Sequence, residues 1–309
     1  MNHEEILDNI ATRKDLLQRG EHPASINKAL VNGQLIRLRE GAYINGSLLN
    51  RLTPWETPLA HIYAYYKRNS SAIFSHVSAA LLYGLDVIDP KNEVHILTET
   101  NSRGRAKDVK KHLVSDLESF PHRMTSEGLA ISAPLETIKF CAQLLPVEQA
   151  LVIADSAVRN KLVAYEELVE FLALGGGYRP RKVQRLASLV SEKSESAGET
   201  LLRWILIMLK IPGIYEQYEV IVNGSLYRMD FAIPDLMLAF EFDGAIKYSR
   251  FGSAEDALLR ERRREVELQN AGWRVVRLNW GDVYKEPEKS KRAIVAAIRQ
   301  QKARVRGGF

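Results

Sequence analysis

The chain has 309 residues, of which 46% are hydrophobic and 26% are charged, so we expect a globular protein with two or three domains. Its single cysteine, Cys141, excludes an internal disulfide, and no Cys/His spacing indicates a zinc site. No signal-peptide core and no apolar run of about 18 residues occurs, so we expect a cytoplasmic protein that does not enter a membrane. The net charge of +5 favours a polyanionic partner.

The first 52 residues have the pattern of three short helices followed by a β-hairpin. Apolar spacing predicts helices at 4–10, 13–19 and 23–33, with Thr12 capping the second helix. Residues 34–44, QLIRLREGAYI, alternate between apolar and polar positions and turn at Glu40 and Gly41. This order predicts a winged-helix domain at 1–52.

Five residues of this segment fit a known family pattern. Gly33, Leu35, Arg37, Gly41 and Tyr43 follow the spacing G-x-L-x-R-x-x-x-G-x-Y. In this spacing the segment resembles the N-terminal domain of AbiEi-type antitoxins. The resemblance implies a DNA-binding repressor or antitoxin, with a cognate toxin as a partner.

A winged helix makes specific residues the candidates for DNA contact. The second helix of a helix-turn-helix pair enters the major groove with its N-terminal residues on base edges, which here are Ser25, Asn27 and Lys28. Arg37 and Arg39, on the wing, are then expected to contact phosphates. The same fold also serves as a protein–protein or dimer module, so self-association is an open alternative.

Residues 59–177 are predicted to form a mostly helical middle domain, which follows a short linker. Helices are expected at 72–88 and repeatedly between 133 and 174, with one strand at 92–98 and an exposed basic loop at 102–111. The run SHVSAALLYGL, residues 75–85, again resembles the AbiEi family. Its His76 has no cysteine or second histidine nearby in the sequence, so we interpret it as a capping or packing residue.

The last segment, 194–309, is organised around an acidic hairpin. Residues 227–233 and 237–243 each have a strand pattern, and Pro234 and Asp235 between them supply a turn. The hairpin would bring Asp230 within about one or two residue pairs of Glu241, and Asp243 would share a face of the second strand with Glu241.

Three carboxylates in a largely apolar setting need compensation. They repel one another and lose solvation, and a divalent cation is the usual compensating group. The hairpin therefore predicts a metal site in which Asp230, Glu241 and Asp243 hold Mg²⁺ or Mn²⁺. Lys247, four residues beyond Asp243, would return to this cluster or meet a phosphate.

The acidic residues also follow a family order. Glu199, Asp230, Glu241-x-Asp243 and Lys247 resemble the PD-(D/E)xK nuclease superfamily, in particular its Vsr-like branch. The resemblance implies a restriction-endonuclease-like α/β domain with a mixed central sheet and metal-dependent phosphodiester hydrolysis. In that reading Glu199 supports the site, and Lys247 stabilises charge on the phosphate or orients the attacking water.

Two groups of these residues have structural alternatives. Ser196 and Glu199 fit S-x-x-E, a capping box at a helix start. In the predicted helix 254–271, Arg260 and Arg264 share a face that would bind a phosphate. Glu261 and Glu265 could equally pair with these arginines, and the helix would then be a salt-bridged surface helix.

The sequence thus predicts a multidomain α/β protein and leaves two functions open. The first is a metal-dependent DNA endonuclease that its winged helix directs to a site. The second is a non-catalytic, AbiEi-like repressor or antitoxin with a degenerate nuclease fold, favoured by Asp243 where the superfamily usually has lysine and by Lys247 where the branch often has histidine.

Overall fold

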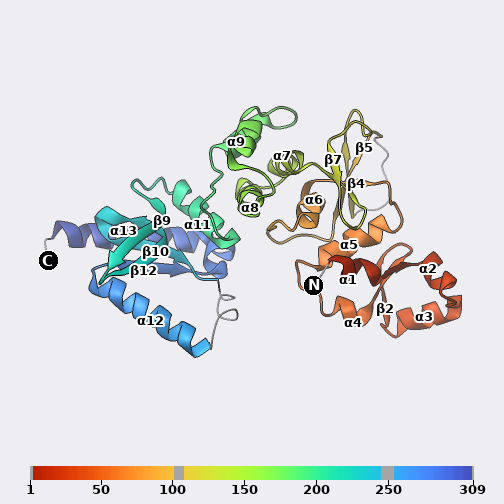
Figure 1. Cartoon of the computed structure of the whole chain (residues 1–309), viewed down its shortest axis with the longest axis horizontal. Helices are drawn as coiled ribbons and strands as arrows, with labels where there is room; N and C mark the ends of the chain where they lie inside the picture. Colours follow the sequence, from red (N-terminus) through yellow and green to blue (C-terminus); the bar gives the residue numbers. More distant parts are fainter. Residues whose placement is uncertain (1–2, 101–107, 245–253, 308–309) are drawn as a thin grey trace. The chain divides into compact units, whose positions relative to one another are not determined.

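The computed structural model describes residues 3–100, 108–244 and 254–307, which form two compact units, Met1–Val190 and Ser191–Phe309 (Figure 1). The second unit begins close to the boundary predicted at residue 194. Both predicted N-terminal domains, 1–52 and 59–177, lie in the first unit. The predicted site residue Lys247 lies outside the described residues.

The N-terminal part of the first unit has the predicted succession of helices followed by a hairpin. Its elements are α1 (His3–Asp8), β1 (Ile10–Thr12), α2 (Arg13–Gln18), α3 (Pro23–Val31), β2 (Leu35–Arg39), β3 (Ala42–Asn45) and α4 (Gly46–Leu49). The strands form an antiparallel sheet in the order β1-β3-β2. Thr12 caps α2 as predicted, because its side chain accepts a hydrogen bond from the Asp15 amide at 3.1 Å. Leu16 of α2 and Ile26 of α3 pack together in the core of this sheet.

The rest of the first unit contains more strands than the sequence predicted. After α5 (Thr57–Tyr66), a mixed five-stranded sheet has the order β6-β5-β4-β8-β7. Its strands are β4 (Ile73–Phe74), β5 (Val94–Thr98), β6 (Val109–Leu113), β7 (His122–Met124) and β8 (Ala130–Ser132). Only β5 was predicted. Strand β6 replaces the end of the predicted basic loop, and the predicted helix 72–88 is split into β4 and α6 (His76–Leu82).

Four helices complete the first unit: α7 (Pro134–Leu144), α8 (Val147–Arg159), α9 (Tyr165–Ala173) and α10 (Pro180–Ala187). Buried side chains cluster between the sheet and this part of the chain, where Ile73, Leu97 and Ala130 contact Phe140 of α7. The sheet is therefore packed against α7 through an apolar core.

The second unit is a four-stranded mixed sheet with helices on both faces. Its strands are β9 (Tyr215–Val222), β10 (Ser225–Ile233), β11 (Leu238–Phe242) and β12 (Arg274–Leu278), in the order β12-β11-β10-β9. Strands β11 and β12 are parallel, and the other two pairs are antiparallel. The predicted hairpin is therefore present, although its second strand ends at Phe242 and its turn is a short 3-10 helix, η1 (Pro234–Leu236).

Side-chain alternation along β11 assigns the two faces of this sheet. The ring of Phe242 lies against Gly198 in α11 (Ala197–Met208). Ala239 points to the other face, where it packs with Leu268 of α12 (Ala254–Asn270). Because Glu241 shares the face of Ala239, its carboxylate lies under α12. The unit ends with η3 (Gly281–Lys285) and α13 (Pro287–Arg306). In the described part of the chain, no helix is both long and apolar enough to cross a bilayer.

Candidate functional site

The acidic hairpin brings two of its three predicted metal ligands to neighbouring positions. Phe231 pairs with Phe240, so the next step of the same register places Asp230 beside Glu241. One oxygen of Asp230 accepts a hydrogen bond from the Phe242 amide at 2.8 Å. Asp243 directly follows the last residue of β11 and is exposed, and its amide donates to the Leu278 carbonyl at 2.8 Å.

Glu241 is bonded to arginines. It is buried, with 7% of its surface exposed. Arg264 donates to both carboxylate oxygens, to Oε2 at 3.1 Å, and the Arg277 guanidinium lies 3.6 Å from Oε2. Burial lowers the pKa of Arg264, but its bonds to Glu241 and Glu261 outweigh that effect and the pKa is raised. These arginines supply the compensation that the sequence assigned to a metal ion.

Glu199 is held by hydrogen bonds at the start of its own helix and by one long-range contact. Ser196 caps α11 by accepting a hydrogen bond from the Glu199 amide at 3.2 Å, so the N-cap half of the predicted capping box is present. The Glu199 carboxylate accepts from the Glu195 amide at 3.0 Å, in place of the Ser196 amide that a full capping box requires. The carboxylate of Glu199 also accepts from the Gln217 side chain at 3.1 Å. Gln217 has a left-handed backbone, with φ of 53°. It lies in β9 between Glu216 and Tyr218, which pair with Phe231 and Met229 of β10. The fold thus joins Glu199 to a residue of the sheet that lies 18 positions away in the sequence.

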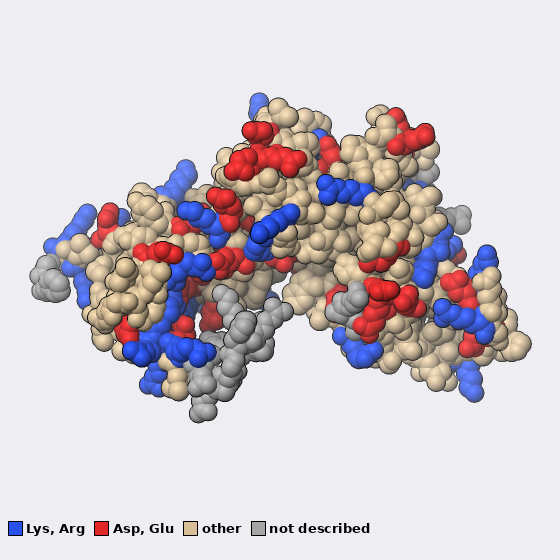
Figure 2. Space-filling model, viewed as in Figure 1, with Lys and Arg blue, Asp and Glu red and all other residues tan. Residues whose placement is uncertain are grey.

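Lys and Arg side chains gather over α12 (Figure 2). Arg260 is exposed, whereas Arg264 is bonded to Glu241, Glu261 and the Arg228 carbonyl. Arg263 forms a further pair with Glu267 at 2.9 Å. The two arginines predicted to share a phosphate-gripping face therefore differ. Arg260 stays a candidate for phosphate contact, and the prediction for Arg264 is corrected because its donors are used within the unit.

The five predicted DNA contacts of the N-terminal part also divide. Asn27, Lys28 and Arg37 are exposed. Ser25 is half-buried, and its hydroxyl accepts from the His22 amide at 3.0 Å and donates to Glu21 at 2.7 Å. Its hydroxyl therefore caps the start of α3.

Arg39 was predicted to contact a phosphate, and the structure corrects this. The side chain is buried and donates to Asp108 at 2.5 Å, to the His61 carbonyl at 2.9 Å and to the Asn92 carbonyl at 3.0 Å. Burial lowers the pKa of Arg39, and Asp108 opposes that effect. Arg39 therefore connects the hairpin to α5 and the five-stranded sheet, and Arg37 is the exposed arginine of β2.

A three-histidine cluster, His76, His95 and His112, was not predicted from the sequence. His76 begins α6, His95 lies in β5 and His112 lies in β6. One ligand nitrogen from each ring lies within 4.8 Å of the other two, and no other set of three His, Cys, Asp or Glu among the described residues meets this criterion. His76 is therefore not an isolated histidine. Alternating strand patterns around His95 and His112 were the available signal, but β6 was not predicted.

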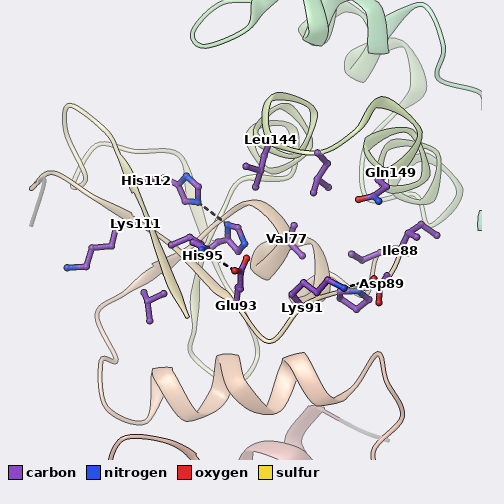
Figure 3. Close-up of a pocket in the computed structure, with 15 residues that line it drawn as sticks. Val77, Ile88, Asp89, Lys91, Glu93, His95, Lys111, His112, Leu144 and Gln149 are labelled. Carbon is purple, nitrogen blue, oxygen red and sulfur yellow. Dashed lines mark hydrogen bonds and ion pairs between the residues drawn. The ribbon is translucent and has the colours of Figure 1, made fainter. Parts of the chain in front are cut away.

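His95 and His112 form one wall of a cavity of about 500 Å³ (Figure 3). His95 Nδ1 and His112 Nε2 are 2.9 Å apart, which is a hydrogen bond. Glu93 and Lys110, which also line the cavity, form an ion pair at 3.1 Å. Val77 and Leu144 add apolar lining. The cavity thus combines apolar side chains with charged groups and two imidazoles, as ligand sites commonly do.

Comparisons with known proteins give relatives without a described activity. No family model matches the chain. The uncharacterized proteins MT2308 and Rv2248, from two strains of Mycobacterium tuberculosis, are each 29% identical to it over 260 residues, which is 83% of this chain and 89% of each relative. A crystal structure of the RV2827C protein from Mycobacterium tuberculosis aligns with 65% of this chain and 78% of its own, at 16% identity and a TM-score of 0.38.

Proposed function

We propose that the chain is a DNA-binding protein of the AbiEi-like repressor or antitoxin class, with an N-terminal winged helix and a nuclease-like second unit that binds DNA without cutting it. The exposed side chains of Asn27 and Lys28 on α3, followed by exposed Arg37 on the hairpin, carry the proposal. A reading helix presents polar side chains to base edges, and a wing presents cations to phosphates. This class implies a cognate toxin as the partner, encoded by a reading frame directly beside this one.

The packing of α3 supports that orientation. Ile26 is buried against Leu16 and Tyr43, so the opposite side of the helix faces solvent. Asn27 and Lys28 follow Ile26 directly and lie on the solvent side. The bonded state of Glu241 supports the second half of the proposal, because a carboxylate held by Arg264 must lose that pair before it can ligate an ion.

We expect Lys28→Ala to weaken binding to a preferred DNA sequence by about 1–3 kcal/mol, as loss of a base contact does. Arg37→Ala should weaken binding to all sequences alike and reduce the salt slope by about 1, as loss of one phosphate contact does. Fluorescence anisotropy with DNA from the gene's own promoter and with a scrambled duplex, over a range of salt concentrations, measures both.

Arg181→Ala is the matched control, because Arg181 is an exposed residue of α10 in the same unit. It should leave affinity and salt slope unchanged. Equal losses from Lys28→Ala on both duplexes would remove the base-reading role of α3, and no loss from either N-terminal variant would overturn DNA binding through this surface.

A metal-dependent endonuclease is the second candidate. The position of Asp230 beside Glu241 favours it, because two acids of the nuclease-like order lie side by side in the sheet. In this candidate Asp230, Glu241 and Asp243 hold Mg²⁺ or Mn²⁺, and the ion polarises the scissile phosphate and activates water. Lys247 would stabilise the phosphate charge, and Glu241 would exchange Arg264 for the ion.

A cleavage assay separates the two candidates. For the endonuclease, we expect Mg²⁺- or Mn²⁺-dependent cleavage of plasmid DNA that Asp230→Asn abolishes and Asp235→Asn, a change at an exposed acid of η1, does not. Asparagine retains an oxygen for the Phe242 amide, so the hairpin bond is preserved. Absence of cleavage by the wild type, together with promoter binding, would support the repressor or antitoxin. Equal cleavage by wild type and Asp230→Asn would point to a contaminating nuclease.

A further inference from the structure

We infer that His76, His95 and His112 form a binding site for a divalent transition metal, for which Zn²⁺ is the best-suited ion. The inference concerns the first unit and does not depend on the proposed DNA binding or on the acidic hairpin. Three imidazoles without a carboxylate suit Zn²⁺, Co²⁺, Ni²⁺ or Cu²⁺ and do not suit Mg²⁺, which prefers oxygen ligands. One kind of catalytic Zn²⁺ site uses three histidines with a water or substrate in the fourth position.

The three side chains come from elements that the fold ties together. The Ser75 amide, just before α6, donates to the His95 carbonyl at 3.0 Å. The His95 amide donates to the Ser78 hydroxyl at 2.9 Å, so α6 and β5 are joined in both directions. His112 follows from the parallel pairing of β5 and β6, in which it lies opposite Leu97. Regular elements hold a site more accurately than free loops do.

His76 has a strained backbone conformation. Its φ is 49°, in the left-handed region that residues other than glycine seldom adopt. Such strain is retained where the surrounding structure requires it, and it concentrates at functional sites. The ring Nδ1 lies 3.0 Å from the Ser75 hydroxyl, so Nε2 is the nitrogen left to face an ion. A metal-bound histidine commonly has such an outer partner on its second nitrogen.

Two of the three ligand nitrogens already lie near the spacing of ligands on one ion. His95 Nδ1 and His112 Nε2 share a proton across 2.9 Å. Two nitrogens on one tetrahedral Zn²⁺, each bonded at about 2.0–2.1 Å, are about 3.4 Å apart. An ion would therefore replace the shared proton with little change in spacing. The rings of His76 and His112 are stacked with centroids 3.5 Å apart, so side-chain rotation must aim the in-plane lone pair of His76 at the ion.

The charge state of the rings fits ligation. Burial lowers the pKa of His95 to about 3 and that of His112 to about 4. Burial, with His112 and His95 as neighbours, lowers the pKa of His76 as well. Burial therefore favours the neutral form of each ring, which is the form that binds metal. The cavity beside His95 and His112 leaves space for a water or small anion as the fourth ligand.

A hydrogen-bonded pair alone does not explain the cluster. The pair between His95 and His112 satisfies those two nitrogens without a third histidine. His76 adds a buried ring in a strained backbone position, also stacked on Phe140 at 4.7 Å. A metal ion gives all three nitrogens a common partner.

The test uses the full-length protein, stripped with a chelator and titrated with ZnCl₂ in a calorimeter and with CoCl₂ in an absorption spectrometer. We expect one equivalent of Zn²⁺ to bind and Co²⁺ to give the visible bands of tetrahedral coordination. His112→Gln should weaken binding by at least about 100-fold, since loss of an outer partner alone costs about 10–100-fold.

His122→Gln is the control, because His122 is an exposed histidine of β7. It should bind Zn²⁺ like the wild type. If His112→Gln does not fold, His76→Asn replaces it, because asparagine tolerates the left-handed backbone and lacks the imidazole. Absence of Zn²⁺ and Co²⁺ uptake by the wild type, or equal uptake by the wild type and the folded variant, would overturn the metal site.

Discussion

Arg264→Met is expected to lower the free energy of unfolding of the second unit by about 3–5 kcal/mol, because it leaves the buried carboxylate of Glu241 without its main partner. Arg277, at 3.6 Å, is the remaining neighbouring cation and is itself shared with Glu261 and Glu265. Three of the four tryptophans, Trp204, Trp273 and Trp280, lie in this unit. Tryptophan fluorescence during urea unfolding of the full chain therefore reports on it.

Two further variants distinguish pairing from loss of packing. The double change Glu241→Met and Arg264→Met should recover most of the lost stability, since removing both partners of a buried pair is often neutral. Arg260→Met, on the exposed side of the same helix, should change stability by no more than about 0.5 kcal/mol. If the double variant is no more stable than Arg264→Met, the destabilisation arises from lost contacts of the arginine side chain and the account of Glu241 is wrong.

The elements that the sequence predicted are those specified by neighbouring residues. Thr12 and Ser196 cap their helices because a hydroxyl and an acid three residues later satisfy the first turn locally. The hairpin 227–243 follows from two alternating runs around Pro234. Such signals require no knowledge of the rest of the chain, and the two N-caps and the hairpin are confirmed.

The missed features depend on contacts between distant residues. His95 and His112 are 17 positions apart and meet through a parallel strand pair, whose register is not written in either strand. Strand β6 carries two lysines and looked like a solvated loop, so its pairing was not predicted. Arg39 and Arg264 were likewise predicted to lie on the surface and contact phosphates. Arg39 and Arg264 instead cross to acids 69 and 23 positions away.

The acidic site was likewise predictable only in part. The order of the acids predicted that Asp230 would lie near Glu241, and the strand register places it there. The ion-pair partners of Glu241 were not predictable, because its arginines come from α12 and β12. A buried acid in a sequence indicates only that compensation is needed, and both a metal and an arginine satisfy that need.

Arg39→Met is expected to lower the free energy of unfolding of the first unit by about 3 kcal/mol or more, because three charge-assisted hydrogen bonds are lost and each is worth about 1.5–3 kcal/mol in favourable cases. Asp108 is half-exposed and regains water when the arginine is removed, which limits the loss. The larger effect comes from the carbonyls of His61 and Asn92, which lose a buried donor. Hydrogen exchange measured by mass spectrometry on peptides of α5 and β5 follows this unit in the full chain.

Arg37→Met is the matched control, two positions earlier in the same strand and exposed, and it should leave hydrogen exchange unchanged. Arg39→Lys should fall between the two, because an ammonium keeps the charge but cannot reach three acceptors with the fixed fork of a guanidinium. Asp108→Asn should cost no more than about 1 kcal/mol, since a half-exposed pair contributes little. If Arg37→Met destabilises the unit as much as Arg39→Met does, the hairpin is stabilised by its exposed face, and Arg37 is then not free to serve as the phosphate contact of the wing.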